Sequence, residues 1–189
     1  MFEQIDISIL RVINVDRIQA LDGFFIFFTN AAPYISGLIP LAFIAMGFYR
    51  KDRRFKFDGY MMGASYLLSV VIANSVKMFI TRPRPFTLYP FIEKLSTGGS
   101  SSFPSGHTAD AFSVAMAVCL LYPRKQVVIP IIIWAMLVGY SRMDLGVHYP
   151  SDVLGGAAVG MLSAVIIIRT FRNRGWAHQP EILESGQEG

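Results

Sequence analysis

Long apolar runs separated by short polar stretches dominate this chain. They cover roughly residues 33–49, 58–80, 106–122, 126–141 and 151–171. A helix that crosses the hydrocarbon of a bilayer needs about 20 mostly apolar residues, and these runs approach or reach that length. They lack the polar face of a helix at the surface of a soluble protein. The pattern therefore predicts an all-α fold, a polytopic bundle of five to six transmembrane helices.

The first residues show a different pattern, in which apolar and charged side chains alternate. Residues 1–17 place several isoleucines among Glu3, Asp6, Arg11 and Asp16, which is typical of an amphipathic helix lying at the membrane interface. The next stretch, LDGFFIFFTN, is too short to cross a membrane alone. It either re-enters the membrane or extends the following helix, so five and six spans are both consistent with the sequence.

Composition supports a membrane protein. The chain is 53% hydrophobic and only 16% charged, whereas a soluble domain carries about 25% charged residues. The single cysteine, Cys119, excludes an internal disulfide and a thiolate metal cluster. The net charge of +4 is modest, and we expect no nucleic-acid partner.

Basic residues mark one side of the predicted bundle. Short connections rich in Lys and Arg normally face the cytoplasm. The connections at 81–105 and 142–150 then face the opposite compartment. The basic residues between or after spans are Arg50, Lys51, Arg53, Arg54, Lys56, Arg124, Lys125, Arg169, Arg172 and Arg174.

The connection at 81–105 is the longest and is rich in Pro, Gly and Ser. Loops of this length in a compact protein are often functional, so we expect it to border a site. We predict one membrane-embedded domain over residues 1–175. The polar tail at 176–189 is predicted to be disordered.

The stretch KMFITRPRP contains the first cluster of polar residues. Lys77 lies near the end of the second span, and Pro83 and Pro85 end the helix beyond it. Taken alone, Lys77 can be a side chain that reaches back to the interface, and Arg82 and Arg84 can be headgroup anchors. However, these cations lie on the side where basic residues are normally scarce, which favours a functional role.

The stretch SFPSGHTADAF contains the second cluster. Ser105 can cap the third span, and Gly106 allows a ligand to approach the backbone closely. The free N–H groups and the dipole of such a helix end favour an anion. An ordinary cap with a solvated His107 is an equally simple interpretation of this motif alone. Asp110, one turn later, is expected to complement the helix dipole.

The stretch YSRMDLGVHYPSD contains the third cluster. Arg142 closes the fourth span, and His148 precedes the fifth. Asp152, four residues later, can reach Nδ1 of His148 if a helix begins there, which leaves Nε2 as a lone pair facing a pocket. The alternative interpretation is a histidine–aspartate pair that only caps the helix.

Together the clusters supply three cations, a helix N-terminus, two histidines and one carboxylate. Cations and fixed donors of this kind match the oxygens of a transferring phosphoryl group. Two histidines can divide the roles of nucleophile and general acid. The carboxylates form no cluster, and two histidines with one aspartate would supply few ligands for a zinc ion. We therefore expect no metal and no cofactor.

The three clusters resemble the motifs of the type-2 phosphatidic acid phosphatase superfamily, a group of integral-membrane lipid phosphate phosphatases. Its pattern K-x6-R-P is matched by residues 77–85, P-S-G-H by 104–107 and S-R-x5-H-x3-D by 141–152. The first spacing selects Arg84 and leaves Arg82 as a supporting or headgroup cation. Asp144 departs from the family, which often has an aromatic or neutral residue there. Pairing with Arg142 and selection against extra negative charge on the substrate are two alternative roles for Asp144. We expect it instead to be a solvated or salt-bridged loop residue.

The resemblance implies a mechanism without metal. His148 would attack phosphorus and form a phosphohistidine, Asp152 would hold its tautomer, and His107 would protonate the leaving oxygen and later activate water. The phosphoryl oxygens would be held by Lys77, Arg84, Ser105, Gly106 and Arg142.

The compact chain is similar to the bacterial undecaprenyl-diphosphatase and phosphatidylglycerophosphatase members of this family. The resemblance implies a lipid phosphate or diphosphate substrate in the bilayer, with undecaprenyl diphosphate and phosphatidylglycerol phosphate first and phosphatidic acid or lipid A 1-phosphate as alternatives. It also implies a multi-pass protein of the inner (cytoplasmic) membrane whose site faces the periplasm or exterior. A lipid-phosphate binding or flipping protein is the alternative from another class, although both histidines are present. The related vanadate haloperoxidases are soluble, which the apolar runs disfavour.

Overall fold

The computed structural model describes residues 2–99 and 101–173, and within them the chain forms helices and no strands. The all-α prediction is therefore confirmed. The predicted polar tail at 176–189 lies outside the described residues. The elements are α1 (Phe2–Val15), the 3₁₀ helix η1 (Gln19–Leu21), α2 (Asp22–Tyr49), α3 (Arg53–Phe79), α4 (Pro85–Leu88), α5 (Gly106–Leu121), α6 (Lys125–Asp144) and α7 (Pro150–Asn173).

Five of these helices correspond to the five apolar runs. Four are long and apolar enough to cross a membrane, namely Gln19–Tyr49, Arg53–Phe79, Lys125–Asp144 and Pro150–Arg172, and α5 is a shorter apolar helix. The stretch at 21–30 continues into α2 rather than re-entering. It therefore extends the first span and adds no sixth one.

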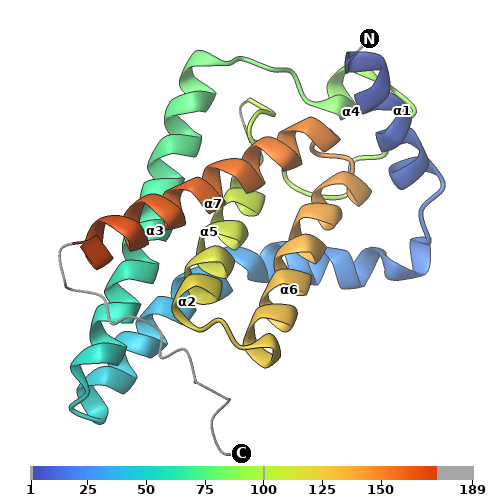
Figure 1. The fold of residues 1–189 in the computed structure, drawn as a ribbon. Coiled ribbons are helices and arrows are strands. Elements are labelled where there is room, and N and C mark those ends of the chain that lie inside the picture. The colour runs from blue at the N-terminus through green and yellow to red at the C-terminus, as the bar shows by residue number, and fades with distance from the viewer. Residues whose placement is uncertain (1, 100, 174–189) are drawn as a thin grey trace, which may run out of the picture.

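The shortest of these helices, α5, occupies the centre of the bundle, with α2, α3, α6 and α7 packed around it (Figure 1). Its inner positions are small: Ala109, Ala111, Ala115 and Ala117 are fully buried. Small side chains allow helix backbones to approach closely in a membrane. This explains how one helix can contact four neighbours.

The closest packing joins α5 to α7 through two glycines in a Gly-x-x-x-Gly arrangement, Gly156 and Gly160. A Cβ atom at Gly156 would collide with the carbonyl of Ser105, and one at Gly160 would collide with the carbonyl of Ala109. The absent side chains therefore let the two backbones touch. The N-terminal ends of α5 and α7 are held side by side as a result, which fixes the relative positions of the motifs they begin.

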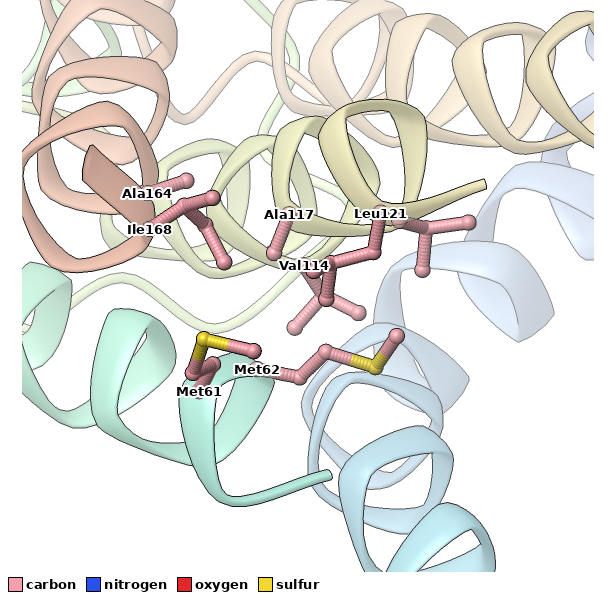
Figure 2. Close-up of a cluster of buried hydrophobic side chains, with 8 residues drawn as sticks. Met61, Met62, Val114, Ala117, Leu121, Ala164 and Ile168 are labelled. Carbon is pink, nitrogen blue, oxygen red and sulfur yellow. The ribbon is translucent and has the colours of Figure 1, made fainter. Parts of the chain in front are cut away.

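The main apolar core lies between α3, α5 and α7 (Figure 2). Methionines from α3 meet aliphatic side chains from the other two helices, and flexible methionine side chains fill irregular gaps well. The labelled members are Met61, Met62, Val114, Ala117, Leu121, Ala164 and Ile168.

Helix α1 has its polarity arranged in an unusual way. Its buried stripe is Asp6, Leu10 and Asn14, spaced four residues apart, whereas Ile5 and Ile9 on other faces are about half exposed. Leu10 packs in a small cluster under the long loop. Polar groups thus face the protein and apolar groups face outward, which suits a helix that lies against lipid.

The long loop and the polar helix ends lie at one end of the bundle. Helices α3 and α6 finish there and α5 and α7 begin there, while the loop runs past α4 and α1 (Figure 1). The buried Asn14 of α1 fastens the loop, because its side-chain amide donates to the carbonyl of Glu93 at 3.0 Å and accepts from the Glu93 N–H at 2.8 Å. The basic connections after α2 and α5 lie at the other end of the bundle.

Candidate active site

The three motifs come together where the starts of α5 and α7 meet. The N–H of Ser105, just before α5, donates to the carbonyl of Asp152 in the first turn of α7 at 2.9 Å. The last turn of α6 brings Arg142, and the last turn of α3 brings Lys77. Segments that are up to 75 residues apart in the sequence, from 77 to 152, therefore share one region.

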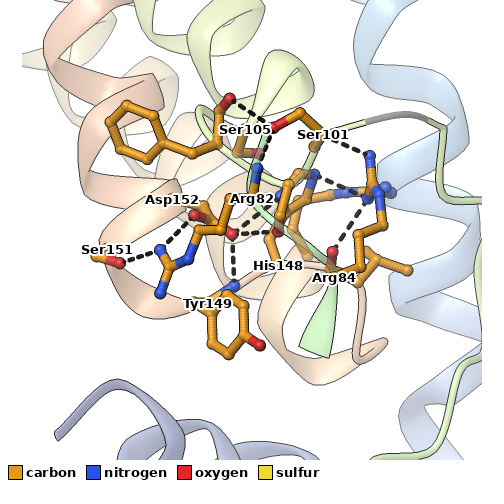
Figure 3. Close-up of polar contacts among 12 residues, drawn as sticks. Arg82, Arg84, Ser101, Ser105, His148, Tyr149, Ser151 and Asp152 are labelled. Carbon is orange, nitrogen blue, oxygen red and sulfur yellow. Dashed lines mark hydrogen bonds and ion pairs between the residues drawn. The ribbon is translucent and has the colours of Figure 1, made fainter. Parts of the chain in front are cut away.

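The predicted contact between His148 and Asp152 is present (Figure 3). Nδ1 of His148 lies 3.5 Å from Oδ2 of Asp152, and both side chains are buried. The same carboxylate oxygen accepts hydrogen bonds from the N–H of Tyr149 at 2.9 Å and from the hydroxyl of Ser102 at 2.5 Å. The N–H of Tyr149 and the hydroxyl of Ser102 thus hold this carboxylate beside the imidazole.

The second ring nitrogen of His148 lies beside a cation. Nη1 of Arg84 lies 3.4 Å from Nε2 of His148. Because a guanidinium only donates hydrogen bonds, Nε2 bears the lone pair and Nδ1 bears the proton that faces Asp152. Burial above all, and then Arg142 and Arg84, lower the pKa of His148 to about 4, against the opposing effect of Asp152. At neutral pH the ring is therefore uncharged.

The long loop holds Arg84 in place. Its guanidinium donates to the carbonyls of Gly99 at 3.2 Å, Ser101 at 3.4 Å and Val147 at 3.0 Å. A Cβ atom at Gly98 would lie only 3.0 Å from Cδ of Arg84. The absence of a side chain at Gly98 therefore lets the loop backbone pass close to Arg84, which positions the cation against His148.

Arg142 is 2% exposed, and in the part of the chain that the structure describes it forms no ion pair. Its guanidinium donates to the hydroxyls of Thr29 and Ser96 and to the carbonyl of Thr97. Among the described residues nothing accepts a hydrogen bond from its Nε. A buried cation with a spare donor and no carboxylate partner is ready to receive an anion.

Lys77 and His107 complete the cluster from α3 and α5. Nζ of Lys77 lies 3.6 Å from the place that a Cβ atom of Gly106 would occupy, so its ammonium faces the start of α5. His107 interacts electrostatically with Lys77, Arg84, Arg142 and His148. Both imidazoles and the three predicted cations therefore converge on one region.

The start of α5 differs in detail from the prediction. Ser105 occupies the N-cap position, but its hydroxyl pairs with the hydroxyl of Thr108 at 2.8 Å and does not cap the helix. The first hydrogen bond within the helix runs from the N–H of Ala109 to the carbonyl of Ser105. The N–H groups of residues 106–108 precede it and have no acceptor within the helix. They form the kind of helix end that binds anions.

One interpretation of the sequence is wrong. Asp144 is not a solvated or salt-bridged loop residue, nor the partner of Arg142: it is the last residue of α6 and is 2% exposed. Helix α1 covers it, since the amide of Asn14 donates to its carbonyl at 2.7 Å. In the described part of the chain, Oδ2 of Asp144 has no hydrogen-bond partner. The charged groups that act on it are Asp22 and Arg17, and Arg142 is not among them.

Two further predictions concern charged residues beside the cluster. Arg82 is a supporting cation and not a headgroup anchor, because its guanidinium donates to Oδ1 of Asp152 at 2.7 Å. Asp110 lies in the first turns of α5 as expected, and its charged neighbour is Lys77.

Sequence reasoning missed two residues that contact this network. Ser102 is fully buried against Asp152, but a run of serines in a loop gives no sign of which one points inward. Asp6 of α1 accepts a hydrogen bond from Arg82 at 2.7 Å. Its signal was available, because Asp6, Leu10 and Asn14 repeat every four residues and so share one face of α1.

Among the described residues, no three His, Cys, Asp or Glu side chains gather in a way that could hold a metal ion. The donors that converge are instead cations, N–H groups and imidazoles. Such a set is suited to an anion with several oxygens, and a neutral imidazole such as that of His148 is chemically able to act as a nucleophile.

Known proteins resemble this chain in sequence and in fold. The chain is 28% identical to undecaprenyl-diphosphatase BcrC of Bacillus subtilis over 151 residues, which is 80% of this chain and 75% of that relative. It is 28% identical to lipid A 4'-phosphatase of Porphyromonas gingivalis over 178 residues, 89% and 73% of the two chains. The crystal structure of the transmembrane PAP2 type phosphatidylglycerolphosphate phosphatase from Bacillus subtilis superposes with a TM-score of 0.76 at 28% identity, covering 92% of this chain and 87% of that one. Residues 59–176 match the family model of the PAP2 superfamily, and the chain belongs to that superfamily.

Proposed function

We propose that this membrane phosphatase of the PAP2 superfamily hydrolyses a lipid phosphate or diphosphate through a phosphohistidine intermediate and needs no metal ion. One observation carries the proposal: three cations and a helix N-terminus converge on a buried, neutral His148 whose Nε2 bears a lone pair. Lys77, Arg84 and Arg142 would bind the phosphoryl oxygens together with the first N–H groups of α5. Gly106 leaves room for the phosphate, and Ser105 sets where the helix begins.

In the first step, Nε2 of His148 attacks phosphorus. A P–N bond forms as the bond from phosphorus to the leaving oxygen breaks, and this oxygen belongs to the lipid alcohol or, for a diphosphate, to the lipid phosphate. The leaving oxygen takes a proton from the imidazolium form of His107, which the negative charge of the bound phosphate stabilises. The imidazole of His148 becomes cationic, and the carboxylate of Asp152 stabilises it through the Nδ1 proton. The cations and helix N–H groups stabilise the charge that develops on the other phosphoryl oxygens.

In the second step, water attacks the phosphohistidine. His107, which has lost its proton, takes one from the water, and the new P–O bond forms as the P–N bond breaks. The bonding pair returns to Nε2, which restores the neutral imidazole and releases inorganic phosphate. Each group thus returns to its starting state without a co-reactant.

The substrate class follows from the position of the site at one end of membrane-length helices. A phosphate at headgroup level can enter there while its lipid tail stays in the bilayer. Undecaprenyl diphosphate and phosphatidylglycerol phosphate are the first substrates to test, in line with the names of two relatives, followed by phosphatidic acid and lipid A phosphates. Because the basic connections lie at the opposite end of the bundle, we place the site on the periplasmic or exterior side of the inner membrane.

The experiment is phosphate release by the purified, full-length protein from a panel of these lipids, with and without EDTA. We expect release from at least one lipid and the same rate in EDTA. Activity that disappears in EDTA would contradict the metal-free mechanism. No release from any phosphorylated lipid, by protein that melts cooperatively, would contradict the proposed function itself.

A further inference from the structure

On the amphipathic helix α1, the carboxylate of Asp6 lies on the face that packs against the protein. Asp6 of α1 is only 8% exposed, while Ile5 beside it is 50% exposed. A buried carboxylate costs free energy unless charged or hydrogen-bonding partners compensate it. An acid that turned to the membrane surface would need no such partners, so the inward position of Asp6 indicates a specific contact.

That contact is a charged chain from Asp6 through Arg82 to Asp152, and Figure 3 shows its link between Arg82 and Asp152. Nη2 of Arg82 donates to Oδ2 of Asp6 at 2.7 Å, and Nη1 donates to Oδ1 of Asp152 at 2.7 Å. The N–H of Ser151 donates to the remaining oxygen of Asp6 at 2.9 Å. The guanidinium also lies over the ring of Tyr149, 4.1 Å from its centroid.

The two carboxylate oxygens of Asp152 therefore have different partners. Oδ2 faces His148 and Ser102, and Oδ1 is held by Arg82. A carboxylate with partners on both oxygens cannot rotate, so its plane is fixed relative to the imidazole. Arg82 can hold that geometry only if its own guanidinium is fixed, which Asp6 accomplishes from α1.

We propose that Asp6 and Arg82 are positioning residues that fix the orientation of Asp152 and balance its charge, so that α1 supports the chemistry of His148 without touching the substrate. The inference rests on the proposed function, because it assigns a role within that reaction. Outer-shell residues, which hydrogen-bond to the side chains that contact the ligand, typically contribute about 10–100-fold to activity.

The charges give this role a signature that simple packing lacks. Arg82 alone would draw the negative charge of Asp152 away from the imidazole, and Asp6 offsets that effect. Removing the negative charge of Asp6 should lower the pKa of His148, and removing the positive charge of Arg82 should raise it. The other charged or titratable groups that face His148, which stay unchanged, are Arg84 from the loop, Arg142 from α6 and His107 from α5.

The test uses full-length Asp6→Asn, Arg82→Gln and Arg82→Lys, with Glu3→Gln as the matched control. Glu3 is an exposed acid on the same helix, and its carboxylate accepts a hydrogen bond from the hydroxyl of Tyr89 at 3.3 Å. We measure kcat, KM, the acid limb of the kcat/KM profile and the melting temperature. Phosphate release by the wild type and its loss in His148→Ala, in the same assay, report separately on the proposed function.

We expect kcat to fall about 10–100-fold in Asp6→Asn and Arg82→Gln, with KM changed less than about threefold. The acid limb should move to lower pH in Asp6→Asn and to higher pH in Arg82→Gln. Arg82→Lys should keep the wild-type limb because it keeps the charge, with a smaller loss of kcat than Arg82→Gln. Glu3→Gln should behave as wild type.

The inference is overturned if Asp6→Asn and Arg82→Gln keep wild-type kcat. It is equally overturned if both lose activity with unmoved acid limbs and a lowered melting temperature, because that outcome describes a purely structural contact. If Asp6→Asn does not fold, the two Arg82 variants decide the matter: an acid limb that moves to higher pH in Arg82→Gln and stays in place in Arg82→Lys supports the inference, and equal limbs in both overturn it. If the wild type releases phosphate by way of His148 while the Asp6 and Arg82 variants keep wild-type activity, this inference fails and the proposed function stands.

Discussion

The two ends of the bundle bury charged side chains in opposite ways. At the end with the basic connections, the carboxylate of Asp58 is buried, accepts a hydrogen bond from the hydroxyl of Tyr122 at 2.5 Å and lies 3.9 Å from Arg54. At the motif end, Arg142 is buried without an ion pair among the described residues, beside Arg84 and Lys77. The first arrangement pairs its buried charge within the protein, whereas Arg142 has no carboxylate partner among the described residues.

This difference separates a structural contact from a binding site. Leaving a buried charge without a partner is strongly unfavourable, so a protein keeps such a group where a ligand supplies the partner. The nearby carboxylate of Asp152 does not serve, because Arg82, Ser102 and His148 already occupy it. The surplus of positive charge is therefore the best marker of where a phosphate would bind.

The largest effect is expected at the nucleophile. His148→Ala should lower turnover by at least about 10⁴-fold, because removing the group that forms the covalent bond closes this route altogether. The measurement is phosphate release, together with a melting curve that shows the variant is folded. His178→Ala, the same substitution outside the three motifs, is the control. Turnover within tenfold of wild type in His148→Ala would remove the phosphohistidine from the mechanism.

The next prediction uses the contrast between the ends directly. Arg142→Gln should lower kcat/KM about 10²–10³-fold, because it removes a preorganised charge at the phosphoryl group. Arg54→Gln, the same change at the opposite end, should leave kcat/KM within about twofold. Inhibition by inorganic phosphate should weaken in the first variant only. Equal losses in both variants would mean that Arg142 acts through folding rather than through anion binding.

Much of the fold was predictable because a bilayer restricts the choices. Backbone groups inside lipid must pair within their own helix, so an apolar run of sufficient length specifies a helix, and the runs at 58–80 and 151–171 became α3 and α7. What the apolar pattern left open was the fate of residues 21–30. Their extension of α2 depends on packing at Phe25 and Thr29, which are buried, and packing is a tertiary property.

The site was predictable where the number of residues between two side chains fixes their relative positions, and not elsewhere. Four residues from His148 to Asp152 suffice to place one above the other if a helix starts between them. Asp144 has no such constraint: its burial results from α1, more than 120 residues earlier in the chain, which covers the end of α6. Ser102 likewise is selected by the path of the loop, which its neighbours in sequence do not determine.

The pH dependence sharpens the comparison by reporting the charge around His148. Because burial and the arginines lower its pKa to about 4, the ring stays neutral well below pH 6, and the acid limb of kcat/KM should lie near pH 4. Below that pH, protonation removes the lone pair and the rate should fall tenfold per unit. Arg84→Gln removes a neighbouring positive charge and should move the limb upward. A limb near pH 6.5, the ordinary histidine value, would contradict the lowering of the His148 pKa by burial and the arginines.

The smallest effect on activity is expected at the end with the basic connections, where Asp58 is paired. Tyr122→Phe removes the hydroxyl that donates to Asp58 and leaves a buried carboxylate oxygen without that partner. An unmade hydrogen bond of this kind costs about 1–3 kcal/mol, so the variant should melt at a lower temperature than wild type in the same detergent. Its kcat/KM, measured well below that temperature, should stay within about twofold, because the contact lies at the far end of α5 from His107. A selective loss of activity without loss of stability would mean that the two ends are coupled, and the division between a structural end and a catalytic end would no longer hold.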